Sequence, residues 1–135
     1  MNRLPKVNRI RSSGCGKAFS KQIEKLGLMP SGGECDIVVI GERGVNSLPC
    51  DADVVFCPTG RLPDGLNCVE AVSVGMDSKA SVCFSSIGDE TSYLCVNREI
   101  DFFGKNVIPG EYRVAMKRGF SLYENMVFGF LDIFL

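Results

Sequence analysis

The stretch SSGCGKAFS, residues 12–20, joins two glycines and a lysine in a form that could hold a phosphate group. It lies between a short apolar and basic segment and a segment with helical periodicity. A Gly-x-Gly turn between a strand and a helix presents backbone amides at the positive end of the helix dipole, and a lysine adds a point charge. The candidate residues of this ligand site are Ser12, Ser13, Gly14, Gly16 and Lys17.

The nucleotide-binding fingerprints differ from this stretch at defined places. The Walker A motif has a glycine where this chain has Arg11, and a serine or threonine where it has Ala18. The Rossmann fingerprint has a third glycine or an alanine where this chain has Phe19. A second interpretation is therefore open, namely a plain strand-to-helix turn capped by Ser12 or Ser13.

Two further residues belong to the ligand hypothesis. Glu42 ends the second candidate strand, where an acid could bind a ribose, although it lies farther from the glycine turn than the usual roughly 20 residues. Lys79 is a second cation that could contact a phosphate. The ligand would be a nucleotide or a phosphometabolite, and no other cofactor and no metal is expected.

The chain contains no histidine, which excludes several reaction classes. Cys–His and Ser–His couples need an imidazole base, and a catalytic zinc site usually needs an imidazole ligand. The seven cysteines are scattered and form no C-x-x-C pair, so we expect Cys35, Cys57, Cys83 and Cys95 to be small core residues. We therefore name no catalytic residue and no metal ligand.

The first half of the chain has the pattern of a small α/β layer. A strand is expected over residues 6–10, and Phe19, Ile23 and Leu26 then recur at helical spacing. Residues 37–40 form an apolar β-branched run, which is typical of a strand covered on both faces, and residues 51–60 repeat that pattern. The order predicts a Rossmann-like parallel layer, with at most a helical turn near residues 45–48 between the last two strands.

The second half has the pattern of antiparallel β structure. Strands are expected over residues 68–74, 81–87, 91–96, 97–103 and 111–116, and the Gly88-Asp89 step favours a hairpin. The fold class predicted for residues 1–135 is a single α/β domain. Its Rossmann-like N-terminal layer is followed by antiparallel β-hairpins and a C-terminal apolar helix.

The last segment, residues 121–135, has a clear helix start. Ser121 and Glu124 have the spacing of a capping box. The helix that follows is apolar around most of its circumference, so it must either run through the core or pack against another chain. If it packs against another chain, the contact residues are Met126, Val127, Phe130 and Phe134.

Charge and hydropathy exclude two kinds of partner. Fifteen basic and sixteen acidic residues leave a formal charge of −1, so no global field attracts nucleic acid or an anionic membrane. No stretch reaches the roughly 20 apolar residues that a membrane span requires, and the first residues lack the apolar region of a secretory signal. We expect a cytoplasmic protein that binds neither nucleic acid nor membrane.

Two segments resemble the central region of the ATP-dependent Mur ligases of peptidoglycan synthesis. They are VSVGMDSKASVCFSSI, residues 72–87, and GFSLYENMVFGFLDIFL, residues 119–135, in which Asn125 corresponds to the second asparagine of the family's helix motif. GCGK is similar to the family's G-K-T phosphate loop, but Ala18 replaces the threonine and Ser121 or its neighbour replaces the helix histidine. The resemblance implies a reduced, non-catalytic relative with a retained ligand pocket.

Two functions are compatible with these patterns. The first is a non-catalytic binding or assembly module that self-associates, or joins a protein partner, through the C-terminal helix. The second is a nucleotide or phosphometabolite binder of reduced Mur-ligase type that uses residues 12–17.

Overall fold

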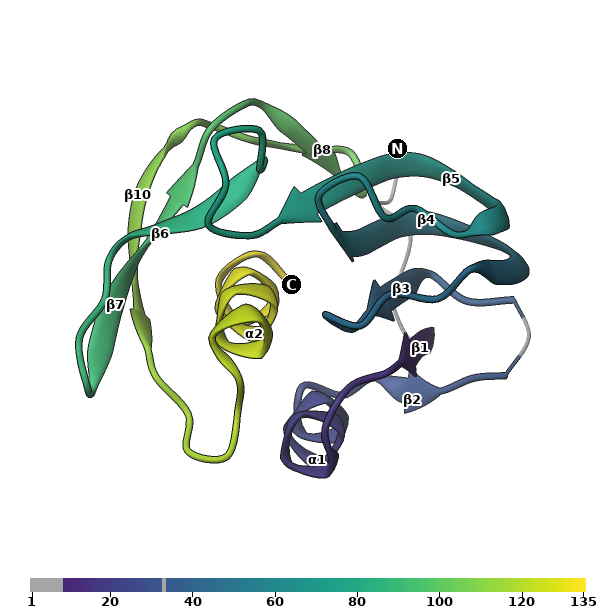
Figure 1. Ribbon diagram of the computed structural model, residues 1–135, viewed down its shortest axis with the longest axis horizontal. Helices are drawn as coiled ribbons and strands as arrows, with labels where there is room; N and C mark the ends of the chain where they lie inside the picture. Colours follow the sequence, from purple (N-terminus) through teal and green to yellow (C-terminus); the bar gives the residue numbers. More distant parts are fainter. Residues whose placement is uncertain (1–8, 33) are drawn as a thin grey trace, which may run out of the picture.

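The computed structural model describes residues 9–32 and 34–135, which form a mixed α/β fold with two helices (Figure 1). Neither helix has the length and apolar character needed to cross a membrane. In chain order the elements are β1 (Arg9–Ser13), α1 (Lys17–Lys25), β2 (Met29–Pro30), β3 (Ile37–Ile40), β4 (Ser47–Pro58), β5 (Asp64–Val74), β6 (Val82–Ser86), β7 (Thr91–Val96), β8 (Ile100–Phe102), β9 (Lys105–Val107), β10 (Gly110–Ala115) and α2 (Leu122–Phe134).

One eight-stranded sheet runs through both halves of the chain, in the order β10-β7-β6-β5-β4-β3-β1-β2. The strands from β2 to β6 pair in parallel, whereas β7 pairs antiparallel with both β6 and β10. Strands β8 and β9 form a separate antiparallel pair. The α/β content and the C-terminal helix are confirmed. The antiparallel second half is correct only from the pairing of β6 with β7 onward, because β5, which contains the strand expected over residues 68–74, pairs in parallel with both β4 and β6.

The N-terminal elements match their sequence signals with small shifts. Strand β1 overlaps the expected strand only at Arg9 and Ile10, and the rest of the expected strand lies outside the described residues. Helix α1 buries Phe19 and Ile23, as its periodicity predicts. All four residues of β3 are buried, as expected for an apolar strand that is covered on both faces.

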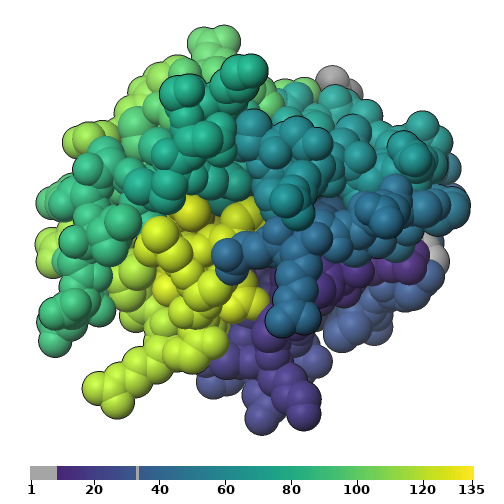
Figure 2. Space-filling view, viewed as in Figure 1, coloured from purple at the N-terminus to yellow at the C-terminus, as the bar shows by residue number. Residues whose placement is uncertain are grey.

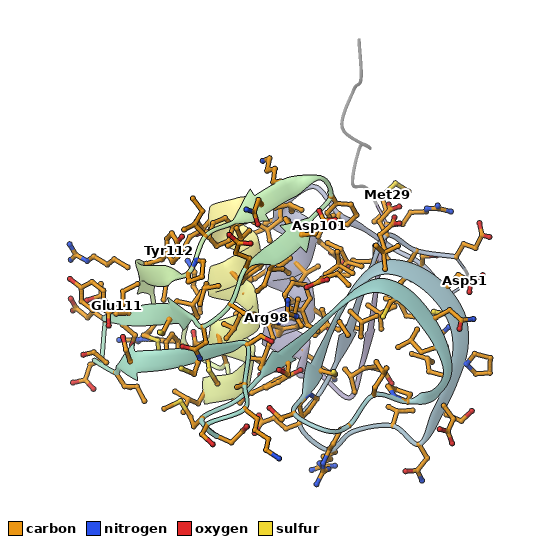
Figure 3. The ribbon with its side chains drawn as sticks, turned by 90° about the horizontal axis from the view of Figure 1, so that it is seen from above. Met29, Asp51, Arg98, Asp101, Glu111 and Tyr112 are labelled. Carbon is orange, nitrogen blue, oxygen red and sulfur yellow. The ribbon has the colours of Figure 1, made fainter. Side chains whose placement is uncertain are left out.

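Strands β4 and β5 curl back over one face of the sheet. Ser47 pairs with Asp64 and Pro58 pairs with Val74, so a short loop must return the chain along the whole length of β4. A straight strand of 12 residues would span about 40 Å, farther than that loop can reach. The strands therefore bend into a coil, visible at the Asp51 end of Figure 3. The helical turn expected near residues 45–48 is wrong, because Ser47 and Leu48 belong to β4.

The curl gives the sheet a core on each face. The main core packs α1 and α2 against one face. The second core lies on the opposite face, where the curl of β4 and β5 supplies the cover that a helix supplies in most parallel sheets. Its buried residues are Cys35, Val38, Ile40, Leu48, Ala52, Val55, Cys57 and Leu66.

Helix α2 belongs mainly to the main core. Its residues from Tyr123 to Leu131 are all buried, so this stretch occupies the first of the two environments that the sequence left open. Three of the four predicted contact residues, Met126, Val127 and Phe130, are at most 2% exposed. The C-terminal segment reaches the surface beside the N-terminal elements (Figure 2). Ile133, in the last turn of α2, and Leu135, which follows the helix, are exposed.

Candidate functional site

A crevice lies at the carboxyl ends of β1 and β3, and it has a volume of about 570 Å³. Strand β1 has β2 on one side and β3 on the other. The chain therefore moves from β1 to one side to form β2, and then crosses to the other side of β1 to form β3. Open α/β sheets bind their ligands where the strand order reverses in this way. The crevice is lined by Gly14, Cys15, Gly16, Gly41, Glu42, Arg43, Ser121 and Glu124.

Two glycines bring the ends of β1 and β3 together. The Gly41 amide donates a 2.7 Å hydrogen bond to the Ser13 carbonyl. A Cβ atom at Gly41 would lie 2.2 Å from the Gly14 carbonyl oxygen, so no other residue fits this position. Gly14 has φ +79°, a conformation that favours glycine. The glycine turn that the sequence singles out therefore has a structural reason that involves no ligand.

The carboxylate of Glu124 lies at the N-terminus of α1. Its Oε2 accepts a 2.6 Å hydrogen bond from the Gly16 amide, and its Oε1 accepts a 2.9 Å bond from the Ser121 amide. The Ser121 hydroxyl accepts from the Glu124 amide at 3.1 Å, which confirms the capping box. Glu124 is only 8% exposed. One internal carboxylate thus caps α2 and also occupies the place that a bound anion would take beside the Gly-x-Gly turn.

The structure separates the residues of the predicted phosphate site. Gly14, Gly16 and Glu42 line the crevice, whereas Ser12 lines a different pocket beside α1. Ser13 contributes its carbonyl to the Gly41 contact. Lys17, in the first turn of α1, and Lys79, in the turn after β5, are not among the residues that line the crevice. The N-cap of α1 is Gly16 without a side-chain cap, so the predicted Ser12 or Ser13 cap is wrong.

Two acidic groups near the crevice stay protonated at neutral pH. Desolvation raises the pKa of the Cys15 thiol to about 12, and the nearby Glu124 and Glu42 carboxylates add to this shift. Burial also raises the pKa of Tyr123, whose hydroxyl donates a 2.5 Å hydrogen bond to the Ile40 carbonyl. A thiol attacks as its thiolate, so Cys15 is not activated as a nucleophile.

Sequence reasoning missed four features of this crevice. Cys15, Gly41 and Arg43 were not chosen as site residues, and Glu124 was assigned only to the cap of its own helix. Arg43 and Glu42 follow directly from the end of a buried strand, which is a recognisable signal for the mouth of a parallel sheet. No signal in the sequence links Glu124 to Gly16, because the two residues meet only when α2 packs beside α1.

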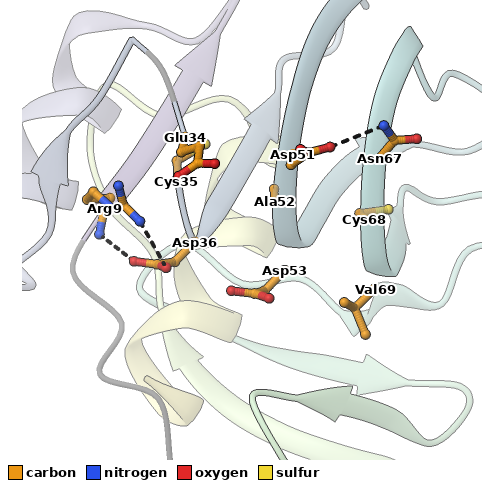
Figure 4. Close-up of a pocket in the computed structure, with 10 residues that line it drawn as sticks. All are labelled: Arg9, Glu34, Cys35, Asp36, Asp51, Ala52, Asp53, Asn67, Cys68 and Val69. Carbon is orange, nitrogen blue, oxygen red and sulfur yellow. Dashed lines mark hydrogen bonds and ion pairs between the residues drawn. The ribbon is translucent and has the colours of Figure 1, made fainter.

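A second pocket of about 460 Å³ lies toward the amino ends of β1 and β3 and along β4 and β5 (Figure 4). Four carboxylates line it, those of Glu34, Asp36, Asp51 and Asp53. Asp36 accepts a 2.9 Å hydrogen bond from the Arg9 amide, and Asp51 accepts a 3.1 Å bond from the Asn67 side chain. Among the described residues, no three His, Cys, Asp or Glu side chains gather closely enough to hold a metal ion.

The thiols of the second core predict a loss of stability in alkali. Desolvation raises the pKa values of Cys35 and Cys57 to about 11. The unfolded chain therefore releases these protons near pH 9, while the folded chain keeps them until about pH 11. Since the folded state then binds more protons, the free energy of unfolding falls as the pH rises through this interval.

Urea unfolding at pH 8 and pH 10.5 measures this effect. The free energy of unfolding of Cys57→Ala is expected to fall less between the two pH values than that of the parent chain, because the variant lacks one of the thiols with a raised pKa. An equal fall in both proteins would contradict the assignment of the effect to these thiols.

Comparison of the chain with models of known protein families, with curated proteins and with solved structures found no match.

Proposed function

We propose that the chain is a non-catalytic assembly module that associates with a second copy of itself. The observation that carries this proposal is the outer edge of β10, which ends the eight-stranded sheet and has no paired strand among residues 9–32 and 34–135. An open edge presents unpaired amides and carbonyls that another strand can bind. The apolar end of α2 lies at the same end of the molecule, where Phe134 packs on Tyr112 of β10 at 5.1 Å between ring centroids.

The role of the C-terminal helix in this proposal differs from the sequence-based expectation. Met126, Val127 and Phe130 stabilise the fold from inside the core, while the half-buried Phe134 and the residues beside it remain at the surface. Ile133 and Leu135 are 38% and 39% exposed. The helix therefore contributes its last turn to association, and the strand contributes the backbone.

Sedimentation velocity over a range of protein concentrations tests the proposal. We expect a monomer at low micromolar concentration and a dimer that grows as the concentration rises. A single monomeric species up to several hundred micromolar, a range in which associations of about −5 kcal/mol or stronger become visible, would contradict self-association.

The second candidate function is a nucleotide or phosphometabolite binder of reduced Mur-ligase type. The position of the crevice favours it, because a Rossmann-like layer binds its ligand beside the first strand at this place. In this function the Gly14 to Gly16 turn and Glu42 contact the ligand inside the crevice, and Lys17 has to reach it from the first turn of α1. The Glu124 carboxylate has to leave the Gly16 amide. The cytoplasmic location expected from the sequence is compatible with both candidate functions.

Thermal unfolding with millimolar ATP, a UDP-sugar or inorganic phosphate separates the two functions. A ligand present at 100 times its Kd stabilises the folded state by about 2.7 kcal/mol, which raises Tm by several degrees. An unchanged Tm with all three ligands is expected for an assembly module. A rise with one of them would favour the binder.

A further inference from the structure

In β10, the amide and carbonyl of every second residue point away from β7 and are available to bind another strand. The Met116 amide donates a 2.8 Å hydrogen bond to the Glu90 carbonyl, in register with the pairing of β10 and β7. Hydrogen-bonded and non-hydrogen-bonded pairs alternate along an antiparallel ladder. The amides and carbonyls of the even-numbered residues 110–116 therefore face β7, and those of Glu111, Arg113 and Ala115 face outward.

The side chains of β10 differ between its two faces. Val114 is buried and Tyr112 is half-buried on the face that packs toward α2, whereas Glu111 and Arg113 are exposed on the other face. Within the described part of the chain neither Glu111 nor Arg113 forms an ion pair. The edge thus presents one acid and one base, placed symmetrically on either side of Tyr112.

We propose that two copies of the chain pair antiparallel through β10, with the two-fold axis at Tyr112. This arrangement rests on the proposed function and specifies its contact. Glu111 then lies opposite Arg113 of the second copy, and Arg113 lies opposite the second Glu111. Both residues have outward-facing backbone groups, so each of these pairs is also a hydrogen-bonded pair of the new ladder. The Ala115 amide meets the Pro109 carbonyl, and because proline has no amide, the Ala115 carbonyl accepts no bond from Pro109 in this ladder.

The charges select this register over its neighbours. A shift that moves the axis to Glu111 places the two Glu111 carboxylates opposite each other, and a shift to Arg113 places two guanidinium groups opposite each other. Like charges directly opposite each other destabilise a strand pair. An axis placed between two residues would pair each outward-facing residue with a residue whose backbone groups already bind β7. It would also place the side chains of each pair on opposite faces of the sheet. Among the axes at residues 111, 112 and 113, the axis at Tyr112 is the one that satisfies the hydrogen bonds and also places opposite charges together.

The other face of the same junction is apolar. Tyr112 lies on the axis opposite its own copy, and its hydroxyl is held by a 2.6 Å hydrogen bond to the Ile108 carbonyl. Ile108 is 64% exposed and faces Met116 of the second copy in this register. In Figure 3, Glu111 and Tyr112 lie at the opposite end of the molecule from Asp51 and the curled strands, so the curl does not obstruct the contact.

Charge exchange tests the contact without altering the core. Glu111→Arg places four basic groups at the junction and Arg113→Glu places four acidic groups, and each change occurs twice because of the two-fold axis. Each single variant is expected to raise the dimer dissociation constant about tenfold or more, and the double variant Glu111→Arg with Arg113→Glu is expected to restore it to within about twofold. Glu99→Arg and Lys21→Glu, at exposed positions elsewhere, make the same changes in net charge and should leave it unchanged.

Sedimentation equilibrium gives the dissociation constants, and circular dichroism confirms that each variant is folded. A dimer that neither single variant weakens would overturn pairing through β10 but leave self-association standing. A double variant that dimerises as weakly as the single variants would also overturn pairing through β10. If the parent chain is a monomer throughout, this contact and the proposed function both fail.

Discussion

Replacing Phe130 with alanine is expected to lower the free energy of unfolding by about 3–5 kcal/mol. Its side chain is fully buried, and its ring packs on Phe56 and Phe102, each at 5.3 Å between centroids, and on Phe134 at 4.7 Å. Alanine would leave a cavity between α2 and the sheet that these aromatic rings cannot fill. Since small domains have only about 5–15 kcal/mol of stability, this loss is a large share of the total. Urea unfolding measures it.

Leu122→Ala is the matched control, on the same helix at a position that is 38% exposed. We expect a change within about 0.5 kcal/mol, as for most surface substitutions. Similar losses in both variants would show that the burial of α2 against the sheet does not stabilise the fold.

Replacing Glu124 with alanine is expected to cost about 3 kcal/mol, because one carboxylate accepts hydrogen bonds from two helix N-termini. The bonds from the Gly16 and Ser121 amides are charge-assisted, and such bonds contribute about 1.5–3 kcal/mol each. Glu124→Gln keeps an oxygen acceptor for one amide and should lose about half as much. Glu24→Ala, at an exposed position of α1, is the control and should lose little.

The same variant tests why the crevice would reject anions. With the carboxylate gone, millimolar inorganic phosphate is expected to raise the Tm of Glu124→Ala while leaving the parent chain unchanged. The physical reason is that the Gly16 amide and the positive end of α1 would then face solvent. If phosphate stabilises the parent chain as strongly as the variant, Glu124 does not block the site and the second candidate function gains support.

Local patterns in the sequence predicted several elements well. The apolar periodicity around Phe19 and Ile23 predicted α1, the Ser121 and Glu124 pair predicted the start of α2, and the apolar run at residues 37–40 predicted a strand buried on both faces. Each of these signals depends on residues within a few positions of one another. The exclusion of imidazole chemistry is equally local, because it follows from composition alone.

The candidate site was predicted only in part, for a physical reason. The glycine turn and Glu42 were found because they follow strands, but the decisive neighbour of Gly16 is Glu124, which is 108 residues away along the chain. A carboxylate in a capping box has a sufficient local role, so its sequence context does not show that it also binds a second helix. Only the packing of α2 beside α1 determines that the crevice already contains a negative charge.

The sequence by itself predicted both helices and most of the strands, though not β2, β9 or the start of β4. It also determined which reactions the chain lacks the groups to perform, and that α2 had to be buried. The tertiary structure alone decided what covers the second face of the sheet and that β10 and β2 are the strands at its two edges. Local propensity specifies the conformation of a strand, but not its neighbours. The curl of β4 onto β5 and the open position of β10 depend on contacts between residues far apart in the chain, which only the folded backbone brings together.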